Sequence, residues 1–153
     1  MLNLTFASTS RDDLEALVQI RIDAMRESLE RIGRFDPTRA RERFLASFDA
    51  SYCRFILVDG ITAGFVLIRP EPDYLLLDHL YIIPRYQGKG VGAAVLDAVL
   101  ADADAQLLPV RLGALRDSDS NRFYQRHGFV KTGESEWDIY YARAPRPLTA
   151  PAA

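Results

Sequence analysis

The sequence predicts a single α/β domain in which helices cover a mixed sheet. Short alternating or apolar segments typical of strands recur between longer segments with apolar residues at helical spacing. One strand-like run, Tyr74–Ile83, leads through a glycine-rich turn into a helix-like stretch that reaches Ala105. A further apolar segment, Val110–Leu115, follows that helix, and a strand–helix–strand succession pairs its strands in parallel through a right-handed crossover. We expect the element order β-α-α-β-β-β-α-β-α-β-β.

Length and composition are those of an ordinary globular domain. The chain has 153 residues, of which 48% are hydrophobic and 26% charged, and a net charge of −2. So small a charge predicts neither a nucleic-acid partner nor a membrane partner. Cys53 is the only cysteine, which argues against a disulfide framework and a cysteine-based zinc site, and its apolar surroundings predict a small buried thiol. Lacking a signal-peptide pattern and a long apolar run, the chain is expected to be cytoplasmic, with one domain over residues 1–144 and a disordered tail at 145–153.

Local signals place the elements of the N-terminal half. Ser10 can cap a helix that begins at Arg11 and ends near Gly33, and Asp36-Pro37 starts a second helix. Asp59-Gly60 is a two-residue turn favoured in hairpins. The strands expected in this half are Asn3–Ala7, Tyr52–Val58 and Ile61–Arg69.

Similar local signals predict the elements of the C-terminal half. The central helix should fade around Ala103, and Ser118 or Asp119 should cap a short helix that runs to Arg126 and ends at Gly128. The last two strands are expected at Val130–Glu134 and Trp137–Ala142.

The turn from Arg85 to Gly92 has the composition of a phosphate-binding loop. Three glycines alternate with other residues just before a helix, an arrangement that directs backbone N–H groups and a helix N-terminus at one point. A Walker A loop is excluded because Lys89 is followed by glycine. Gly88, Gly90 and Ala93 fit the dinucleotide pattern, but the strand at 110–115 lacks the acidic residue that holds a ribose. A dinucleotide site stays an alternative.

A third pattern, [RQ]-x-x-G-x-[GA], is met by Arg85-Tyr86-Gln87-Gly88-Lys89-Gly90, and here the chain resembles the GCN5-related N-acetyltransferase (GNAT) family. Leu80-Tyr81-Ile82 followed by Pro84 is similar to that family's fourth strand. The segment from Asn121 to Phe129 is similar to its fourth helix, and the element order fits from residue 3 to about 143.

The resemblance implies the acyl-CoA N-acyltransferase fold, with strands 4 and 5 parallel and splayed, and acetyl-CoA as cosubstrate without a metal. The pyrophosphate would lie on backbone N–H groups from Tyr86 to Gly92, where glycine lets the backbone approach. A backbone N–H at Leu80 or Ile82 would polarise the thioester carbonyl. The implied cofactor-binding residues are Leu80, Tyr81, Ile82, Arg85, Tyr86, Gln87, Gly88, Lys89, Gly90, Val91, Gly92, Asn121 and Tyr124.

Tyr124 matches the family's general acid toward the departing CoA thiolate. A phenol near pKa ~10 and a thiol near ~8.5 differ by roughly 2 kcal/mol, so we expect Tyr124 mainly to hydrogen-bond the developing thiolate. Asn121, one turn earlier on the same helix face, can hold the cofactor arm. The family often has Asn seven positions before the tyrosine, where this chain has Asp117.

A general base must also take a proton from the amine, which is mostly protonated at neutral pH. Asp78 is the leading candidate, because it shares a strand face with Leu80 and Ile82 by period two, and a carboxylate in an apolar strand is costly unless paired or used. His79 points to the other face, and its ordinary pKa suits a base better. A water relay is the third possibility.

The resemblance places the amine substrate between Met25–Asp36 and Glu134–Asp138 and leaves its identity open, as a small molecule or a peptide. The charged candidates there are Arg26, Glu27, Glu30, Arg31, Arg34, Glu134, Glu136 and Asp138. Members of the family often form homodimers, so that state is also open. The resulting hypothesis is an acetyl-CoA-dependent N-acetyltransferase that acts by direct transfer in a ternary complex. The alternatives are a non-catalytic acyl-CoA-binding or sensing module and a dinucleotide-dependent regulator.

Overall fold

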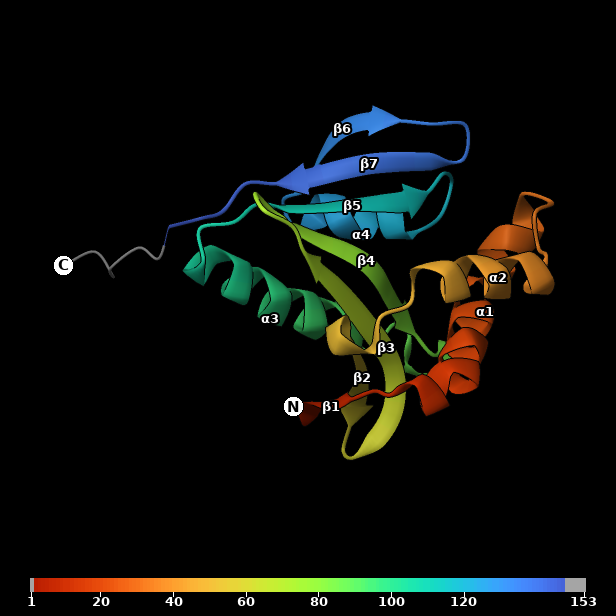
Figure 1. Cartoon of the computed structure of the whole chain (residues 1–153). Coiled ribbons are helices and arrows are strands. Elements are labelled where there is room, and N and C mark those ends of the chain that lie inside the picture. The colour runs from red at the N-terminus through yellow and green to blue at the C-terminus, as the bar shows by residue number, and fades with distance from the viewer. Residues whose placement is uncertain (1, 148–153) are drawn as a thin grey trace. The chain divides into compact units, whose positions relative to one another are not determined.

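The structure is a computed structural model that describes residues 2–147. These residues divide into two compact units, of which the first comprises residues 2–68 and 79–95 and the second residues 69–78 and 96–147. Hydrogen-bonded neighbours among the strands follow the order β1-β2-β3-β4-β5-β7-β6, which makes a mixed seven-stranded sheet (Figure 1). Strands β3 and β4 and helix α3 contribute residues to both units.

The first unit is built on an antiparallel ladder of three strands. These are β1 (Leu4–Ser8), β2 (Cys53–Val58) and β3 (Ile61–Pro70). In the ladder, Phe55 of β2 lies opposite Phe65 of β3. Asp59 and Gly60 connect these strands with φ angles of 51° and 78°. Two successive positive φ angles suit the twist of a two-residue hairpin, so the predicted hairpin is confirmed.

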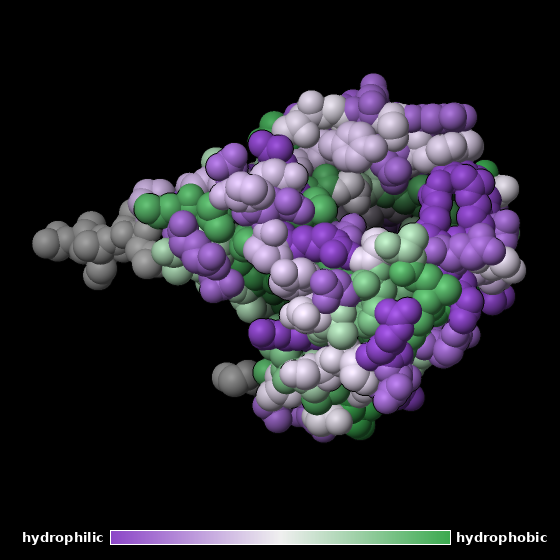
Figure 2. Space-filling model, viewed as in Figure 1, coloured by the Kyte–Doolittle hydropathy of each residue, from purple (hydrophilic) through white to green (hydrophobic). Residues whose placement is uncertain are grey.

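Helices α1 (Leu14–Arg31), preceded by a 3₁₀ turn η1 (Arg11–Asp13), and α2 (Pro37–Ser47) complete the core of this unit. The predicted cap at Asp36 is confirmed, because its carboxylate accepts from the backbone N–H of Arg39 at 3.2 Å. The buried side chains of the helices and strands form one core cluster of Leu17, Val18, Ile20, Ile22, Phe44, Cys53, Phe65 and Leu67. Hydrophilic residues gather over the end of α1 and the connection to α2 (Figure 2).

The second unit combines parallel and antiparallel pairing. Its elements are drawn from β4 (Leu75–Ile82), α3 (Val91–Ala105), β5 (Val110–Leu115), α4 (Ser120–Arg126), β6 (Val130–Glu134) and β7 (Asp138–Arg143). Leu75 pairs with Val110 and Leu76 with Arg111 in parallel, as predicted. Strand β7 lies antiparallel between β5 and β6 (Figure 1). Along β5, Val110, Leu112 and Ala114 are buried, and the residues between them are not.

Several predicted boundaries shift by one or two residues. The helix expected from Arg11 opens as the 3₁₀ turn, and α3 continues beyond Ala103 to Ala105. Asp119 precedes α4 but makes no capping bond, because its own φ and ψ of −65° and −20° are helical and a capping residue is normally extended. Residues 144–147 have no regular structure, and the rest of the predicted tail, 148–153, lies outside the described residues.

Cys53 is a buried thiol, as predicted, with an exposed fraction of 1%. Burial raises the pKa of this thiol to about 11. At pH 8 only about one molecule in a thousand would then carry the reactive thiolate. We therefore expect a disulfide reagent such as DTNB to label the native protein far more slowly than the guanidinium-unfolded protein, as followed by absorbance. Rapid stoichiometric labelling of the native state would contradict this expectation, and Cys53→Ala gives the background.

The second unit also holds a nearly buried ion pair between α3 and β7. The guanidinium of Arg143 donates to both carboxylate oxygens of Asp104 at 2.8 and 3.2 Å, and the two side chains are only 6% and 14% exposed. The backbone N–H of Arg146 adds a third bond at 2.9 Å. The hydrogen bond from Arg143, followed by that from Arg146, holds the pKa of Asp104 below its ordinary value.

Replacing Asp104 by Asn should lower the free energy of unfolding by about 3 kcal/mol at neutral pH, because it leaves the Arg143 charge buried without a counter-charge. A carboxyl group whose pKa is depressed by folding stabilises the fold above its unfolded pKa, and this stabilisation is lost as the pH falls through the folded pKa. The difference between wild type and variant should therefore shrink below about pH 4. Denaturant titrations at several pH values measure it. Asp102→Asn, an exposed residue of the same helix, is the control and should change stability by less than about 0.5 kcal/mol.

Candidate functional site

The predicted strand–turn–helix is present, and its turn lies in the first unit. After β4, Pro84–Tyr86 form a 3₁₀ turn, and the following residues through Gly90 stay exposed. Gly88 and Gly90 have φ angles of 74° and 82°, a region that side chains with a Cβ rarely adopt. A Cβ on either glycine would meet no atom within 4 Å. The turn therefore presents bare backbone to open space directly before α3.

The N-terminus of α3 supplies backbone donors at this turn. The N–H of Ala94 donates to the carbonyl of Gly90 at 3.0 Å, so the N–H groups just before Ala94 have no acceptor within the helix. The positive end of the helix dipole lies here, beside the exposed side chains of Arg85 and Lys89. These features together form a receptor for an anionic group.

Part of the predicted donor set is used within the turn itself. Tyr86 N–H donates to the carbonyl of Ile83 at 2.8 Å, and Gln87 N–H donates to that of Pro84 at 3.1 Å. The predicted set of pyrophosphate donors is therefore corrected: the N–H groups of Tyr86 and Gln87 bind within the 3₁₀ turn, and those from Gly88 to Gly92 remain candidates. The Gln87 side chain in turn donates to the Ile82 carbonyl at 2.8 Å.

Gly64 on β3 allows an unusually close backbone approach that the sequence reading missed. A Cβ at this position would lie 2.0 Å from the carbonyl oxygen of Tyr81, so only glycine fits without moving backbone. Next to it, Ile83 N–H donates to the Ala63 carbonyl at 2.7 Å. An isolated glycine within a strand pattern is the signal that could have indicated this contact.

His79 lies in a polar network inside the first unit. The guanidinium of Arg21 donates to the Tyr81 hydroxyl at 3.3 Å, and that hydroxyl lies 3.1 Å from Nδ1 of His79. Because the hydroxyl accepts from arginine, its own proton is available to Nδ1. The imidazole also packs against Phe44 and Phe65 with ring centroids 5.1 and 6.2 Å apart. These contacts hold the His79 ring among other side chains of the first unit, and its use as a base stays a prediction.

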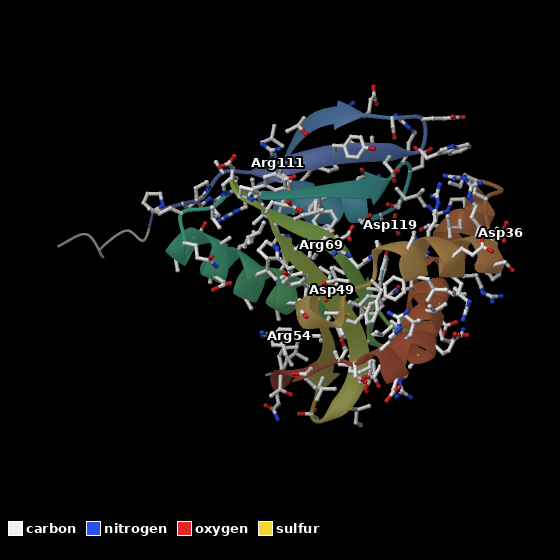
Figure 3. The ribbon with its side chains drawn as sticks, viewed as in Figure 1. Asp36, Asp49, Arg54, Arg69, Arg111 and Asp119 are labelled. Atoms are coloured by element: carbon white, nitrogen blue, oxygen red, sulfur yellow. The ribbon has the colours of Figure 1, made fainter. Side chains whose placement is uncertain are left out.

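Asp78, in the second unit, forms an ion pair with Arg69. The Arg69 Nε donates to Asp78 Oδ2 at 2.9 Å, and the two side chains are 22% and 27% exposed. Arg69 projects from the end of β3 (Figure 3). A carboxylate in an apolar strand required either pairing or use, and the structure shows the pairing.

Helix α4 positions the other predicted residues. Tyr124 is 8% exposed, and its ring packs edge-on against Phe123 and Phe129 with centroids 5.2 and 5.6 Å apart. Asn121 donates to the carbonyls of Leu115 and Ser118, both at 2.9 Å, and its oxygen accepts from the Tyr141 hydroxyl at 2.8 Å.

Asn121 thus has a role in the fold, and its contact with the cofactor arm stays a prediction. Both of its amide N–H groups and its oxygen already bind the protein, so the residue joins β5, α4 and β7. Helical spacing places Asn121 one turn before Tyr124, but it carries no information about partners on β5 and β7.

Several of the charged candidates for substrate contact have protein partners. Hydrogen bonds from Arg116 and then Lys131 lower the pKa of Glu134. Glu27 lies 3.6 Å from Arg31, and the Arg26 guanidinium lies over the Phe35 ring at 4.6 Å from its centroid. Glu134 is thus already paired with Arg116, which follows β5, and with Lys131 of its own strand.

The loop residues and Leu80–Ile82 belong to the first unit, whereas Asp78, Asn121 and Tyr124 belong to the second. Among residues 2–147, no group of three or more His, Cys, Asp or Glu side chains is placed to hold a metal ion. No helix in the same range is long and apolar enough to cross a membrane.

The sheet is mixed, with β4 and β5 parallel, and a glycine turn after β4 opens helix α3. This arrangement is typical of α/β proteins with the acyl-CoA N-acyltransferase fold. The family model described as acetyltransferase (GNAT) domain matches residues 50–131. This match covers more than half of the chain, and the chain therefore belongs to the GNAT family. Membership of this family favours acetyl-CoA over a dinucleotide as the ligand of the turn.

Proteins similar to this chain in sequence are named as N-acetyltransferases. An uncharacterised N-acetyltransferase of Mycobacterium tuberculosis is 38% identical over 78 residues, which are 49% of this chain and 50% of that protein. The chain thus spans about half the length of that relative. Spermine/spermidine N(1)-acetyltransferase of Bacillus subtilis is 30% identical over 59% of this chain and 70% of its own length.

Solved structures share the fold. The PaiA N-acetyltransferase of Thermoplasma acidophilum, crystallised in complex with coenzyme A, superposes with a TM-score of 0.73 at 17% identity over 93% of this chain and 99% of its own. The ribosomal-protein-S18-alanine N-acetyltransferase of Escherichia coli gives a TM-score of 0.70 at 17% identity, with 98% of each chain covered.

Proposed function

We propose that the chain is an acetyl-CoA-dependent N-acetyltransferase that transfers an acetyl group directly to a primary amine in a ternary complex. The observation that carries the proposal is the turn after β4. There, Gly88 and Gly90 hold positive φ angles over open space, and the free N–H groups of the α3 N-terminus follow at once. This turn lies within the segment that matches the GNAT domain.

In this proposal the pyrophosphate of acetyl-CoA binds the backbone from Gly88 to Gly92, with Arg85 and Lys89 adding positive charge. A helix N-terminus and bare glycine backbone together suit a diphosphate, because donors converge where no Cβ intervenes. A backbone N–H of Leu80 or Ile82 polarises the thioester carbonyl.

The chemistry is a single acyl transfer. The lone pair of the neutral amine attacks the thioester carbonyl carbon, the tetrahedral oxyanion collapses, and the carbon–sulfur bond breaks to release the CoA thiolate. One proton leaves the nitrogen, and the thiolate gains one. Tyr124 hydrogen-bonds the developing thiolate, and the amine proton goes to Asp78, to His79 or through water. The thiol of Cys53 is buried and protonated, which supports direct transfer over an acyl-enzyme.

The acceptor class is an amine. The names of related proteins refer to spermine and spermidine, to the N(6′) position of aminoglycosides, and to an alanine of a ribosomal protein. A primary amine is the group these acceptors have in common, and we extend only that class to this chain.

A non-catalytic acyl-CoA-binding module is the second candidate, favoured by one observation. Asp78, the leading candidate for the general base, is held in an ion pair with Arg69. Such a module would keep the phosphate-binding turn and lack turnover.

A thermal-shift comparison of acetyl-CoA, CoA, NAD and ATP tests cofactor binding. Ligand at 100 times its Kd should stabilise the fold by about 2.7 kcal/mol, which is several degrees for a domain of this size. We expect a shift with the two CoA compounds alone, and a shift with NAD alone would contradict the proposal. An amine screen that follows free CoA thiol then separates the enzyme from the binding module.

A further inference from the structure

A pocket lies in the second unit. It has a volume of about 350 Å³, and its walls come from α3, from the end of α4 and from the chain at and beyond the end of β7. That volume suits a small organic molecule or ion. None of the residues assigned above to acetyl-CoA or to the acyl transfer lines this pocket.

Arg143 is the buried cation of this pocket. It is 5% exposed, and its two terminal nitrogens bind Asp104. Its third guanidinium nitrogen, Nε, is buried, and the N–H of this atom has no hydrogen-bond partner among residues 2–147. A buried donor of a charged group is costly when it is left unpaired, so this N–H requires an acceptor that the described chain does not provide.

Two further guanidinium groups line the pocket. The position that a Cβ would take on Gly128 lies 2.7 Å from an Nη atom of Arg146 and 3.9 Å from Nε of Arg143, so these two cations converge there. Arg126 contributes from the last turn of α4. Neither the Arg126 guanidinium nor that of Arg146 pairs with a carboxylate in the described part of the chain.

The charged side chains that line the pocket have a net positive charge. Arg143 and Asp104 balance one another, and Arg126 and Arg146 then face one carboxylate, Asp97. The His127 ring is held by donation from Nδ1 to the Phe123 carbonyl at 2.9 Å, and its Nε2 lies 4.0 Å from Asp97. An anion is therefore the favoured occupant.

We propose that this pocket binds a small oxyanion, borne by a phosphate or a carboxylate group. Arg126 and Arg146 supply the charge, and Nε of Arg143 supplies a directed donor at the floor. Guanidinium groups present several donors in a planar fork, which matches the oxygens of phosphate and carboxylate better than those of other small anions.

Arginine Nε–Hε signals in ¹H–¹⁵N spectra test the proposal on the whole protein. Inorganic phosphate and, separately, malonate are titrated at constant ionic strength maintained with chloride, with coenzyme A present to occupy the cofactor loop. We expect the Arg143 Nε–Hε signal, assigned through its side-chain carbons, to move saturably with at least one probe. The probe that acts identifies the oxyanion as phosphate or carboxylate.

Matched variants assign the response to the pocket. Arg146→Gln should weaken binding of the active probe at least about tenfold, because it removes charge-assisted hydrogen bonds. Arg122→Gln, on the exposed part of α4 and outside the pocket, should leave the affinity within about twofold. Arg126→Gln is the second variant if Arg146→Gln loses its fold.

A linear response that never saturates, or an equal response of Arg146→Gln and wild type, would overturn the proposal. A second phosphate titration without coenzyme A is the comparison. A response that is seen only without coenzyme A would also overturn the proposal. Because the pocket and the cofactor turn share no residue, failure of the acetyltransferase assignment would leave this test unaffected.

Discussion

Replacing Gly90 by Leu should weaken acetyl-CoA binding by more than about 100-fold, equivalent to about 2.7 kcal/mol, as measured by calorimetric titration. The φ angle of Gly90 is 82°, and the space into which a Cβ would point is empty to 4 Å. A leucine side chain at that position would enter the space proposed for the pyrophosphate. Its Cβ would also strain the turn that orients the N–H groups of α3.

Gly60→Leu is the matched control. Gly60 has a φ angle of 78° and an equally open Cβ position, but it lies in the hairpin turn between β2 and β3. Both substitutions should therefore incur a similar backbone strain of about 1–3 kcal/mol. Only the variant in the proposed cofactor turn should lose binding. Wild-type affinity in a folded Gly90→Leu protein would remove the turn from the cofactor site.

Replacing Tyr124 by Phe should lower kcat by more than tenfold and leave the affinity for acetyl-CoA within a few-fold. Phenylalanine keeps the ring that packs against Phe123 and Phe129, so the fold should persist. What is lost is the hydroxyl proposed to stabilise the thiolate, a group that develops charge only as the carbon–sulfur bond breaks. An interaction made only in the transition state affects kcat and not ground-state binding.

Single-turnover measurements check this expectation, because they report the chemical step even when product release limits kcat. Tyr52→Phe removes a hydroxyl from a residue that is 40% exposed in the other unit and should leave kcat unchanged. An unaltered single-turnover rate in Tyr124→Phe would return Tyr124 to a purely structural role in the core of its unit.

Asp78 has two possible roles, as the ion-pair partner of Arg69 and as the general base of the reaction. Its carboxylate is neutralised by Arg69 at 2.9 Å, which accounts for a charged residue in an apolar strand without invoking catalysis. The presence of a carboxylate in this apolar strand is therefore no longer evidence for catalysis. A role of Asp78 as general base stays a proposal.

The sequence by itself determined the order of the elements, the hairpin at Asp59-Gly60, the cap at Asp36 and the glycine turn before α3. Each of these depends on residues within a few positions of one another, because turn geometry, capping and side-chain periodicity are local properties of the backbone. The parallel pairing of β4 with β5 was also predictable, since a strand–helix–strand connection allows few alternatives.

Only the tertiary structure decided which side chains have spare bonding capacity. Asn121 and Tyr141 are 20 residues apart, and Asp104 and Arg143 are 39 apart, yet each pair is joined by hydrogen bonds. Likewise, Gly64 is required because the carbonyl of Tyr81, on another strand, approaches it. Partners so far apart in the chain meet only after the strands have paired, so no local pattern can reveal whether a polar residue serves the site or the fold.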